Sequence, residues 1–388
     1  MKRRKAEMSS PRPAGEPLDL VWDPGSMQAD FGQADFDCSG RRERKHYLTA
    51  SWPYSNAGFS QVFGGETAEC VCQGLKDIFE YTGAVPNVIV FDNATGIGRR
   101  VAGGVAETEL FARFRAHYGF EVRFCNPNSG HEKGSVERKV SFHRRNLFVP
   151  VPSFDDVEAY NEELLGLCLG LESRDHYRKE LPIRDLLAKD IAASHALPER
   201  PFDCVRYEYL KADGYGYVTV DASHVYSTSP AHARTEVVAA VRAHTVEIYD
   251  AAGGLLSRHR RGFGKARTES IDATSTISQL ISRPGAWRNS RLREQVPAAV
   301  AERMDGLSAS ELKDDLRILA QAIGRSGVEA VFDALDVLAS EREDFPDFFQ
   351  VGVLAARIAG FGLTTAPEPG GDLGVYDEIF LAGGGAGR

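Results

Sequence analysis

The 388-residue sequence has no apolar run approaching the roughly 18 residues that a membrane-spanning helix requires. Residues 1–5 are basic, but no apolar segment follows them as it would in a secretory signal. The six cysteines include no CxxC pair and no zinc-type spacing with histidine. These absences favour a cytoplasmic protein with reduced cysteines and no membrane partner.

A nucleotide site and a uniformly basic surface are also missing. The sequence Gly262-Phe263-Gly264-Lys265 lacks the G-x-x-x-x-G-K-[ST] form of a P-loop. The net charge of −9 argues against an overall basic nucleic-acid-binding protein. Charge is uneven, however: residues 204–267 hold nine basic and six acidic side chains, whereas residues 288–388 hold ten and seventeen. The acidic tail therefore suits a protein partner better than phosphates.

The first half of the chain predicts an α/β domain. Residues 1–24 are polar and proline-containing and are interpreted as a linker. Residues 25–150 follow the order β-β-β-α-β-α-β-α, which predicts a mixed sheet with helices on its faces. The first three strands are predicted at 27–36, 46–52 and 58–63, with a polar turn at 40–45.

The second half predicts three further parts. Residues 151–203 form a helical connection, with helices predicted at 153–171 and 182–193. Residues 204–268 contain short strands separated by turn residues, and we interpret them as a small all-β barrel. Helical periodicity returns in 269–362, and the glycine- and proline-rich residues 363–388 are expected to be disordered.

A turn-forming cluster at 126–130 precedes a predicted amphipathic helix that ends near Leu147. One face of this helix is built from Val136, Val140, His143 and Leu147. Glu137 lies on a different face, beside Lys133, Ser141 and Arg144. Glu132 falls about 140° from Glu137 around the axis, so only one of these two glutamates can point toward that basic neighbourhood.

Three acids stand where a carboxylate site could form. Two-metal phosphoryl transfer needs carboxylates from separate segments, because Mg²⁺ prefers oxygen ligands. Asp30 lies in the first predicted strand, Asp92 directly follows an apolar strand, and Glu137 is near the start of the helix. Asp92-Asn93 is equally typical of a turn. Acids such as Asp30, Asp35 and Glu137 can also simply face solvent, so spacing alone does not decide.

Three pieces of the sequence resemble the catalytic motifs of transposases and integrases with a retroviral-integrase-like core. They are 28–32 (Gln-Ala-Asp-Phe-Gly), 90–96 (Val-Phe-Asp-Asn-Ala-Thr-Gly) and 126–138 (Asn-Pro at its start, Gly-Ser-Val-Glu-Arg at its end). With Pro24-Gly25 ahead of the first motif, the sequence is more narrowly similar to IstA-type insertion-sequence transposases. This resemblance covers roughly residues 20–270 and implies an RNase H-like fold for the mixed sheet.

The resemblance implies that Asp30, Asp92 and Glu137 are the acidic triad that holds Mg²⁺ or Mn²⁺, as two ions. It favours Asp30 over Asp35 because the motif glycine follows Asp30-Phe31, and it favours Glu137 over Glu132 because Gly-x-Val-Glu-Arg is the family pattern. The 44 residues between Asp92 and Glu137 fit this family if the glycine-rich stretch 96–105 forms a loop.

The implied function is a DDE-type DNA transposase that catalyses metal-dependent 3′-end cleavage and strand transfer of an insertion sequence. The implied partners are DNA ends, target DNA, further copies of the chain and an IstB-type AAA+ ATPase. Candidate DNA-binding residues are Asn93, Lys133, Arg138, Lys139, Arg144, Arg145, Arg258, Arg260, Arg261, Lys265 and Arg267. The alternative interpretation of these cations is a solvated basic surface, and that of Asn93 is a turn residue.

Two other functions are kept as alternatives. The family normally carries helix-turn-helix domains ahead of the core, whereas this sequence begins in the linker, so it could be a non-catalytic DNA-binding remnant or regulator that oligomerises with intact transposase. An RNase H-like nuclease that acts on RNA–DNA hybrids fits the fold, but not the Gly-Ser-Val-Glu-Arg helix or the extra β domain. Residues 283–288 also resemble a family pattern, with a contact to DNA or to the ATPase as one interpretation and an ordinary helix start as the other.

Overall fold

The computed structural model describes residues 22–91, 96–101, 104–124, 130–341 and 348–361. They form two compact units. Unit 1 comprises the residues up to Tyr209 together with Val238–Glu247 and Arg260–Ala266. Unit 2 comprises Leu210–Val237, Ile248–His259 and the residues from Arg267 onward.

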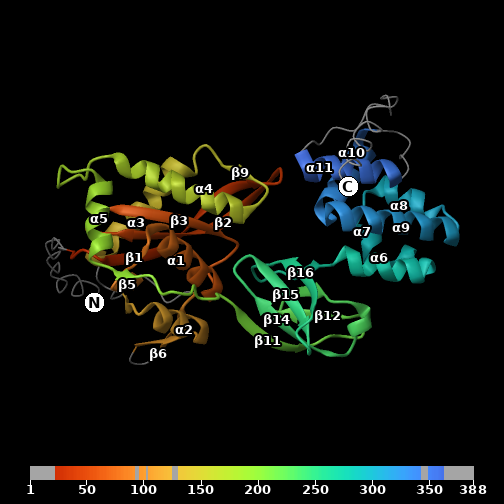
Figure 1. The fold of residues 1–388 in the computed structure, drawn as a ribbon, viewed down its shortest axis with the longest axis horizontal. Helices are drawn as coiled ribbons and strands as arrows, with labels where there is room; N and C mark the ends of the chain where they lie inside the picture. Colours follow the sequence, from red (N-terminus) through yellow and green to blue (C-terminus); the bar gives the residue numbers. More distant parts are fainter. Residues whose placement is uncertain (1–21, 92–95, 102–103, 125–129, 342–347, 362–388) are drawn as a thin grey trace, which may run out of the picture. The chain divides into compact units, whose positions relative to one another are not determined.

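The central sheet of unit 1 has the strand order β3-β2-β1-β5-β8, with β9 paired to the end of β1 (Figure 1). Strands β1, β2 and β3 are antiparallel, whereas β5 and β8 run parallel to β1. The bounds are β1 Ser26–Cys38, β2 Arg41–Trp52, β3 Ala57–Phe63, β5 Val88–Phe91, β8 Glu121–Phe124 and β9 Ser153–Phe154. This arrangement confirms the predicted mixed α/β sheet.

Helices cover both faces of this sheet. On one face, α1 (Ala68–Thr82) packs its Gly74 against Leu48 and Phe63, and α2 (Glu109–Tyr118) packs beside it. On the other face, α3 (Gly130–Leu147) lies across β1 and β2, and α4 (Val157–Gly170) lies against β3. The apolar core of unit 1 is built mainly from the α1 face, where aromatic rings of β5, α1 and α2 cluster.

Local sequence signals mark the helix boundaries in unit 1. Helix α1 ends at Gly83, which has a left-handed φ of 76° that glycine adopts without steric cost. Helix α2 begins after Thr108, whose side chain accepts a hydrogen bond from the Phe111 backbone. A further helix, α5 (Ile183–Ala192), carries the buried Asp190, which accepts hydrogen bonds from the backbones of Gly25 and Ser55.

Three local predictions are corrected. The polar turn at 40–45 is only the Ser39-Gly40 turn, where both residues have positive φ, so β2 begins at Arg41. The glycine-rich stretch after Gly96 is not a loop: β6 (Gly98–Val101) and β7 (Gly104–Glu107) pair as an antiparallel hairpin. Helix α4 begins at Val157, where Asp156 caps it, because Ser153 already belongs to β9.

Short strands make up most of residues 206–270. One sheet has the order β11-β14-β15-β16 and a second has the order β12-β13-β17. Their bounds are β11 Arg206–Lys211, β14 Glu236–Val241, β15 Thr245–Asp250, β16 Leu255–Arg260, β12 Tyr217–Val220, β13 His224–Ser227 and β17 Thr268–Ser270. The strands β4 (Ala84–Val85) and β10 (His195–Ala196) pair separately. Closure into a barrel stays a prediction.

The chain then becomes helical, as expected. The helices are α6 Ala273–Ser282, α7 Arg291–Gln295, α8 Ala298–Asp305, α9 Ala309–Ser326, α10 Val328–Glu341 and α11 Phe348–Phe361. Trp287, which lies in the 3-10 helix Pro284–Asn289, is buried, and its indole Nε1 donates to Asp305 at 3.0 Å. Of residues 283–288, Trp287 therefore supplies core packing to unit 2. Among the described helices, none is long and apolar enough to cross a membrane.

Gly32 allows α3 to approach the sheet closely. A Cβ atom at Gly32 would lie 2.4 Å from Tyr47 Cζ and 2.6 Å from Val140 Cγ1. Both distances are shorter than van der Waals contact, so any larger side chain would push α3 away from β1. The glycine that follows Asp30-Phe31 in the first motif thus has a packing role.

We expect Gly32→Ala to destabilise the protein by about 1–3 kcal/mol, because the added methyl overpacks the α3 contact. Chemical denaturation monitored by circular dichroism measures this change. Gly166→Ala is the matched control, since Gly166 lies in α4 and a Cβ atom added there would meet no neighbour within 4 Å. That substitution should be neutral or stabilising by about 0.5–1 kcal/mol. Equal stability of the Gly32 variant and the unsubstituted protein would contradict this account.

Candidate active site

Asp30 lies in the middle of the sheet, on the face that α3 covers. It pairs with Thr49 across β1 and β2, and its neighbour Ala29 pairs with Phe91 on the parallel strand β5. Because Phe91 is the last residue of β5, the chain leaves this strand alongside Asp30. Asp92 and Asn93, which follow Phe91, lie outside the described residues.

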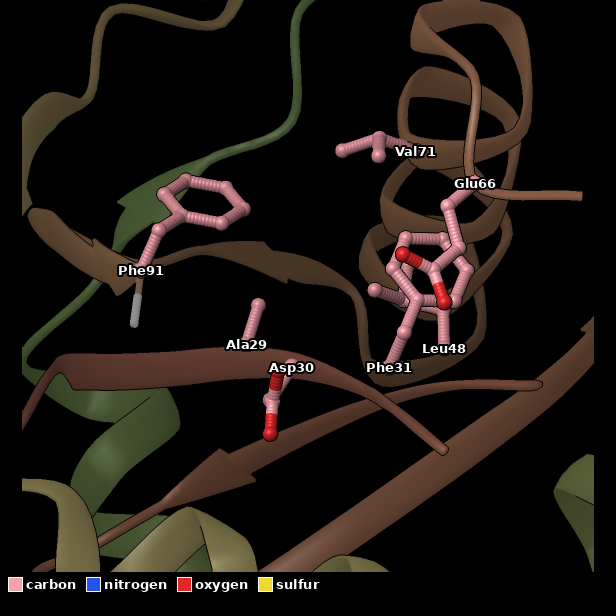
Figure 2. A pocket seen from close by; sticks show the side chains of 7 residues that line it. All are labelled: Ala29, Asp30, Phe31, Leu48, Glu66, Val71 and Phe91. Atoms are coloured by element: carbon pink, nitrogen blue, oxygen red, sulfur yellow. The ribbon is translucent and has the colours of Figure 1, made fainter. Parts of the chain in front are cut away.

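Figure 2 shows that the Asp30 side chain leaves β1 on the face opposite to Ala29 and Phe31. On the Ala29 side, a small pocket is lined by Ala29, Asp30, Phe31, Leu48, Glu66, Val71 and Phe91. Its wall includes the acid Glu66, which is hydrogen-bonded to His46 Nδ1 at 2.8 Å. Sequence reasoning missed Glu66, whose only signal is its place after Gly64-Gly65, just before α1.

Tyr47 connects the surroundings of Asp30 to α3. Its hydroxyl donates to the carbonyl oxygen of Val140 at 3.0 Å. Burial raises the pKa of Tyr47 to about 12, the Arg144 charge opposes this rise, and the Asp30 charge adds to it. The charges of Arg144 and Asp30 therefore both act on the same phenol.

Helix α3 presents Glu137 outward and a partly polar face inward. Glu137 is exposed, while Val136, Lys139 and His143 are buried, so Glu137 lies on a different face from Val136 and His143, as predicted. His143 Nδ1 is hydrogen-bonded to Ser60 Oγ at 2.7 Å, and Ser60 Oγ to Thr49 Oγ1 at 2.8 Å. Burial lowers the pKa of His143 well below its usual value, so the ring is neutral. This chain of polar groups ends at Thr49, the cross-strand partner of Asp30.

The prediction that Lys139 contacts DNA is corrected, because this side chain is buried. Only 3% of Lys139 is exposed, and its Nζ lies 3.2 Å from Glu172 Oε1. Glu172, at the start of the connection after α4, is itself fully buried. Burial lowers the pKa of Lys139, and the Glu172 charge opposes that shift. The two side chains form an internal ion pair, which leaves no ammonium surface for a phosphate.

Other predicted DNA contacts on α3 remain on the surface. Arg138, Arg144 and Arg145 are exposed along the helix. The backbone of Lys133 lies within α3, but its side chain is outside the described part of the chain. The predicted DNA contacts that are exposed on α3 are thus three arginines, all of which follow Glu137 in the sequence. No acidic residue follows Glu137 on this helix.

The predicted DNA contacts around the β domain also divide into exposed and buried side chains. Arg258, Arg260, Lys265 and Arg267 are exposed. Arg260 donates to the carbonyl of Asp155 at 3.2 Å, and Arg267 pairs with Glu269 at 3.0 Å. Arg261 is the exception and corrects the prediction, because only 6% of it is exposed and its Nη1 lies 3.2 Å from Glu69 Oε2.

Glu69, in the first turn of α1, is the centre of a buried cluster. It pairs with Arg261 and with Arg206, and Arg261 also donates to the carbonyl of Arg242 at 2.8 Å. Burial alone would raise the pKa of Glu69, but the two arginines and the Thr67 hydroxyl hold it at about 2. Arg261 therefore joins segments within unit 1 instead of binding phosphate.

Comparisons with known proteins bear on this geometry. The family described as "Mu transposase, C-terminal domain" matches residues 197–270. A transposase of Aminobacter aminovorans is 28% identical over 70% of this chain and 54% of its own length. The chain is a relative of insertion-sequence transposases. The transposase for IS21 of Pseudomonas aeruginosa is another relative, 24% identical over 50% of each chain.

This protein's chain spans only about half the length of the curated relatives it matches. The similarity to transposases of insertion sequences, IS21 among them, agrees with the IstA-type resemblance of the three motifs. Among solved structures, the catalytic core of BIV integrase is 14% identical, with a TM-score of 0.33 over 44% of this chain and 98% of that one.

The Glu69 cluster predicts a pH dependence. A carboxyl with a folded pKa near 2 and an ordinary value near 4.5 stabilises the fold above pH 4.5, and this contribution is lost as the pH falls toward 2. The shift corresponds to about 3 kcal/mol. We expect the stability difference between the parent protein and Glu69→Gln to be constant above pH 5 and to shrink below it.

Urea denaturation between pH 3 and pH 7 measures this difference. Glu80→Gln is the matched control, because Glu80 is an exposed acid on the same helix. Its stability difference should stay near zero throughout. A Glu69→Gln difference that does not change with pH would show that Glu69 carries no charge-dependent stabilisation.

Proposed function

We propose that this chain is the catalytic part of a DDE-type transposase, with an RNase H-like core that cleaves the 3′ ends of an insertion sequence and joins them to target DNA. The observation that carries the proposal is the pairing of Ala29 with Phe91. This pairing brings the end of β5, the strand of the second motif, alongside Asp30 in β1. Helix α3 also contacts β1. Two motif segments thus meet in the sheet, and the helix that carries the end of the third contacts the same strand, β1.

The residues fit a hard divalent cation. Asp30, Asp92 and Glu137 would hold Mg²⁺ or Mn²⁺, since carboxylate oxygens are the ligands these ions prefer. Among the described residues no group of three possible ligands occurs, and Asp92 is not one of those residues. Asp30 is half-buried on the α3 face and Glu137 is exposed on α3 itself. The chemistry that two bound ions would supply is stabilisation of the attacking and leaving oxygens of a phosphodiester.

The chain's own cations would hold the DNA. Arg138, Arg144 and Arg145 are exposed on the helix that carries Glu137, and guanidinium groups bind phosphate oxygens with paired hydrogen bonds. Such contacts position DNA but do not read its sequence. Because two element ends must be joined, we infer that the active form is a homo-oligomer, and that an IstB-type AAA+ ATPase supplies the energy-dependent step.

Glu137→Gln and Asp92→Asn should each reduce Mg²⁺-dependent joining of pre-cut ends to plasmid DNA by about 100- to 1,000-fold, because a lost ligand costs several kcal/mol of transition-state stabilisation. DNA affinity, measured by fluorescence anisotropy, should remain unchanged. Glu163→Gln, at an exposed position on α4, is the control and should join ends normally.

Full joining activity in the Glu137 variant would refute the proposal. If the unsubstituted protein binds ends but joins none, the non-catalytic regulator is the better assignment. Cleavage of RNA–DNA hybrids without joining would instead identify an RNase H-like nuclease.

Arg145→Met should weaken DNA binding and lower the slope of log affinity against log salt by about 0.9, the value for one phosphate contact on duplex DNA. Arg113→Met is the control, since Arg113 is exposed on α2, across the sheet from α3. Its slope should match that of the parent protein. An unchanged slope for Arg145→Met would remove this residue from the proposed DNA surface.

A further inference from the structure

We propose that the buried Lys139–Glu172 ion pair is a positioning device that fixes Glu137 relative to Asp30. The inference rests on the proposed function, in which these two acids share a metal site. Lys139 follows Glu137 by two residues, so the two side chains leave α3 about 200° apart. Glu137 can therefore point outward only when Lys139 points into the fold. We call the groups that surround Lys139 (Glu172, Gly58 and Asn56) its socket, and this socket controls the rotation of the helix about its axis.

The socket is specific for the lysine. Glu172 Oε1 accepts a hydrogen bond from Lys139 Nζ at 3.2 Å and another from the Gly58 backbone at 3.0 Å. Lys139 Nζ also donates to the carbonyl oxygen of Asn56. The lysine stem crosses β3 at Gly58, where a Cβ atom would lie 2.8 Å from Lys139 Cδ. The ammonium therefore reaches its partners along one path, over a residue without a side chain.

This contact fixes the register of α3 in a way that apolar packing does not. Val136 and Val140 contact their neighbours through dispersion, which has no preferred direction. Hydrogen bonds between charged groups depend strongly on distance and angle. A metal site tolerates errors of only about 0.5 Å in its ligands, so the position of Glu137 requires such a constraint.

The socket also distinguishes Lys139 from the arginines on the same helix. Arg138, one residue earlier, is exposed, whereas Lys139 and Glu172 are buried to 3% and 0% exposure. A phosphate contact would require Lys139 to leave the buried Glu172 with only the more distant Arg174, at 3.9 Å, as a charged partner, which is costly. Lys139 therefore acts on catalysis through Glu137 and not through DNA.

The test replaces both charges together, as Lys139→Met with Glu172→Gln, because removing one partner would leave an unpaired buried charge. Three measurements are made on the folded protein: Mn²⁺ binding by electron paramagnetic resonance, the Mg²⁺ concentration for half-maximal end joining, and DNA affinity. We expect about tenfold weaker Mn²⁺ binding, the range seen when partners of metal ligands are lost, with a matching rise in the Mg²⁺ requirement and unchanged DNA affinity.

Lys189→Met is the matched control, since Lys189 is exposed on α5, and it should match the parent protein in all three measurements. Unchanged Mn²⁺ affinity in the folded double variant overturns the inference, and so does a loss of DNA affinity alone. If the double variant does not fold, Glu172→Asp, which keeps both charges but shortens the acceptor by one methylene group, is tested with the same criteria.

The parent protein separates this inference from the proposed function. Mn²⁺ binding without end joining refutes the transposase activity, while the Mn²⁺ comparison still decides whether the ion pair positions Glu137. Absence of Mn²⁺ binding in the parent protein overturns both the metal site and the inference.

Discussion

The seating of α3 on the sheet depends on a contact between charges that are removed from water. Lys139 and Glu172 are both buried, and each would carry a large desolvation penalty without the other. Such a pair contributes little net stability compared with apolar side chains of the same size. Its distinctive property is that it accepts only one arrangement of the helix. Two glycines support this arrangement: Gly32 allows the helix to lie close to β1, and Gly58 allows the lysine stem to lie close to β3.

The two faces of the central sheet consequently differ in chemistry. Toward α1, the strands present Ala29, Phe31 and Leu48, which pack by apolar contact. Toward α3, Thr49 and Ser60 are buried and hydrogen-bonded to each other and to His143. Apolar contacts have no preferred direction, whereas hydrogen bonds depend on both distance and angle. Asp30 belongs to the hydrogen-bonded face, which is the better support for an acid whose position matters.

Much of this fold could be predicted because its signals are local. The strand Val88–Phe91 is a continuous apolar run, and the ends of α1 and α2 are marked by glycine at 83 and 119. The hairpin β6–β7 was missed, since a glycine-rich sequence carries no period that distinguishes a strand from a loop.

The errors in the candidate site have a different cause. Lys139 and Arg261 were assigned to DNA because cations are usually exposed. Their partners, Glu172 and Glu69, are 33 and 192 residues away in the chain. No local pattern reveals such a pairing, although the spacing of Lys139 from Val136 and His143 does place it on the inward face of α3. The convergence of Asp30 with the end of β5 likewise became visible only through strand register.

The positions of the exposed cations also explain how a chain with a negative net charge could approach DNA. The net charge of −9 is repulsive at long range, but at physiological ionic strength charges are screened beyond about 8 Å. A phosphate near Glu137 would therefore respond mainly to the charges closest to it, among them the exposed Arg138, Arg144 and Arg145. Lys139 adds little to this local field because Glu172 neutralises it. The same helix thus uses Lys139 to hold its place in the fold and exposes Arg138, Arg144 and Arg145.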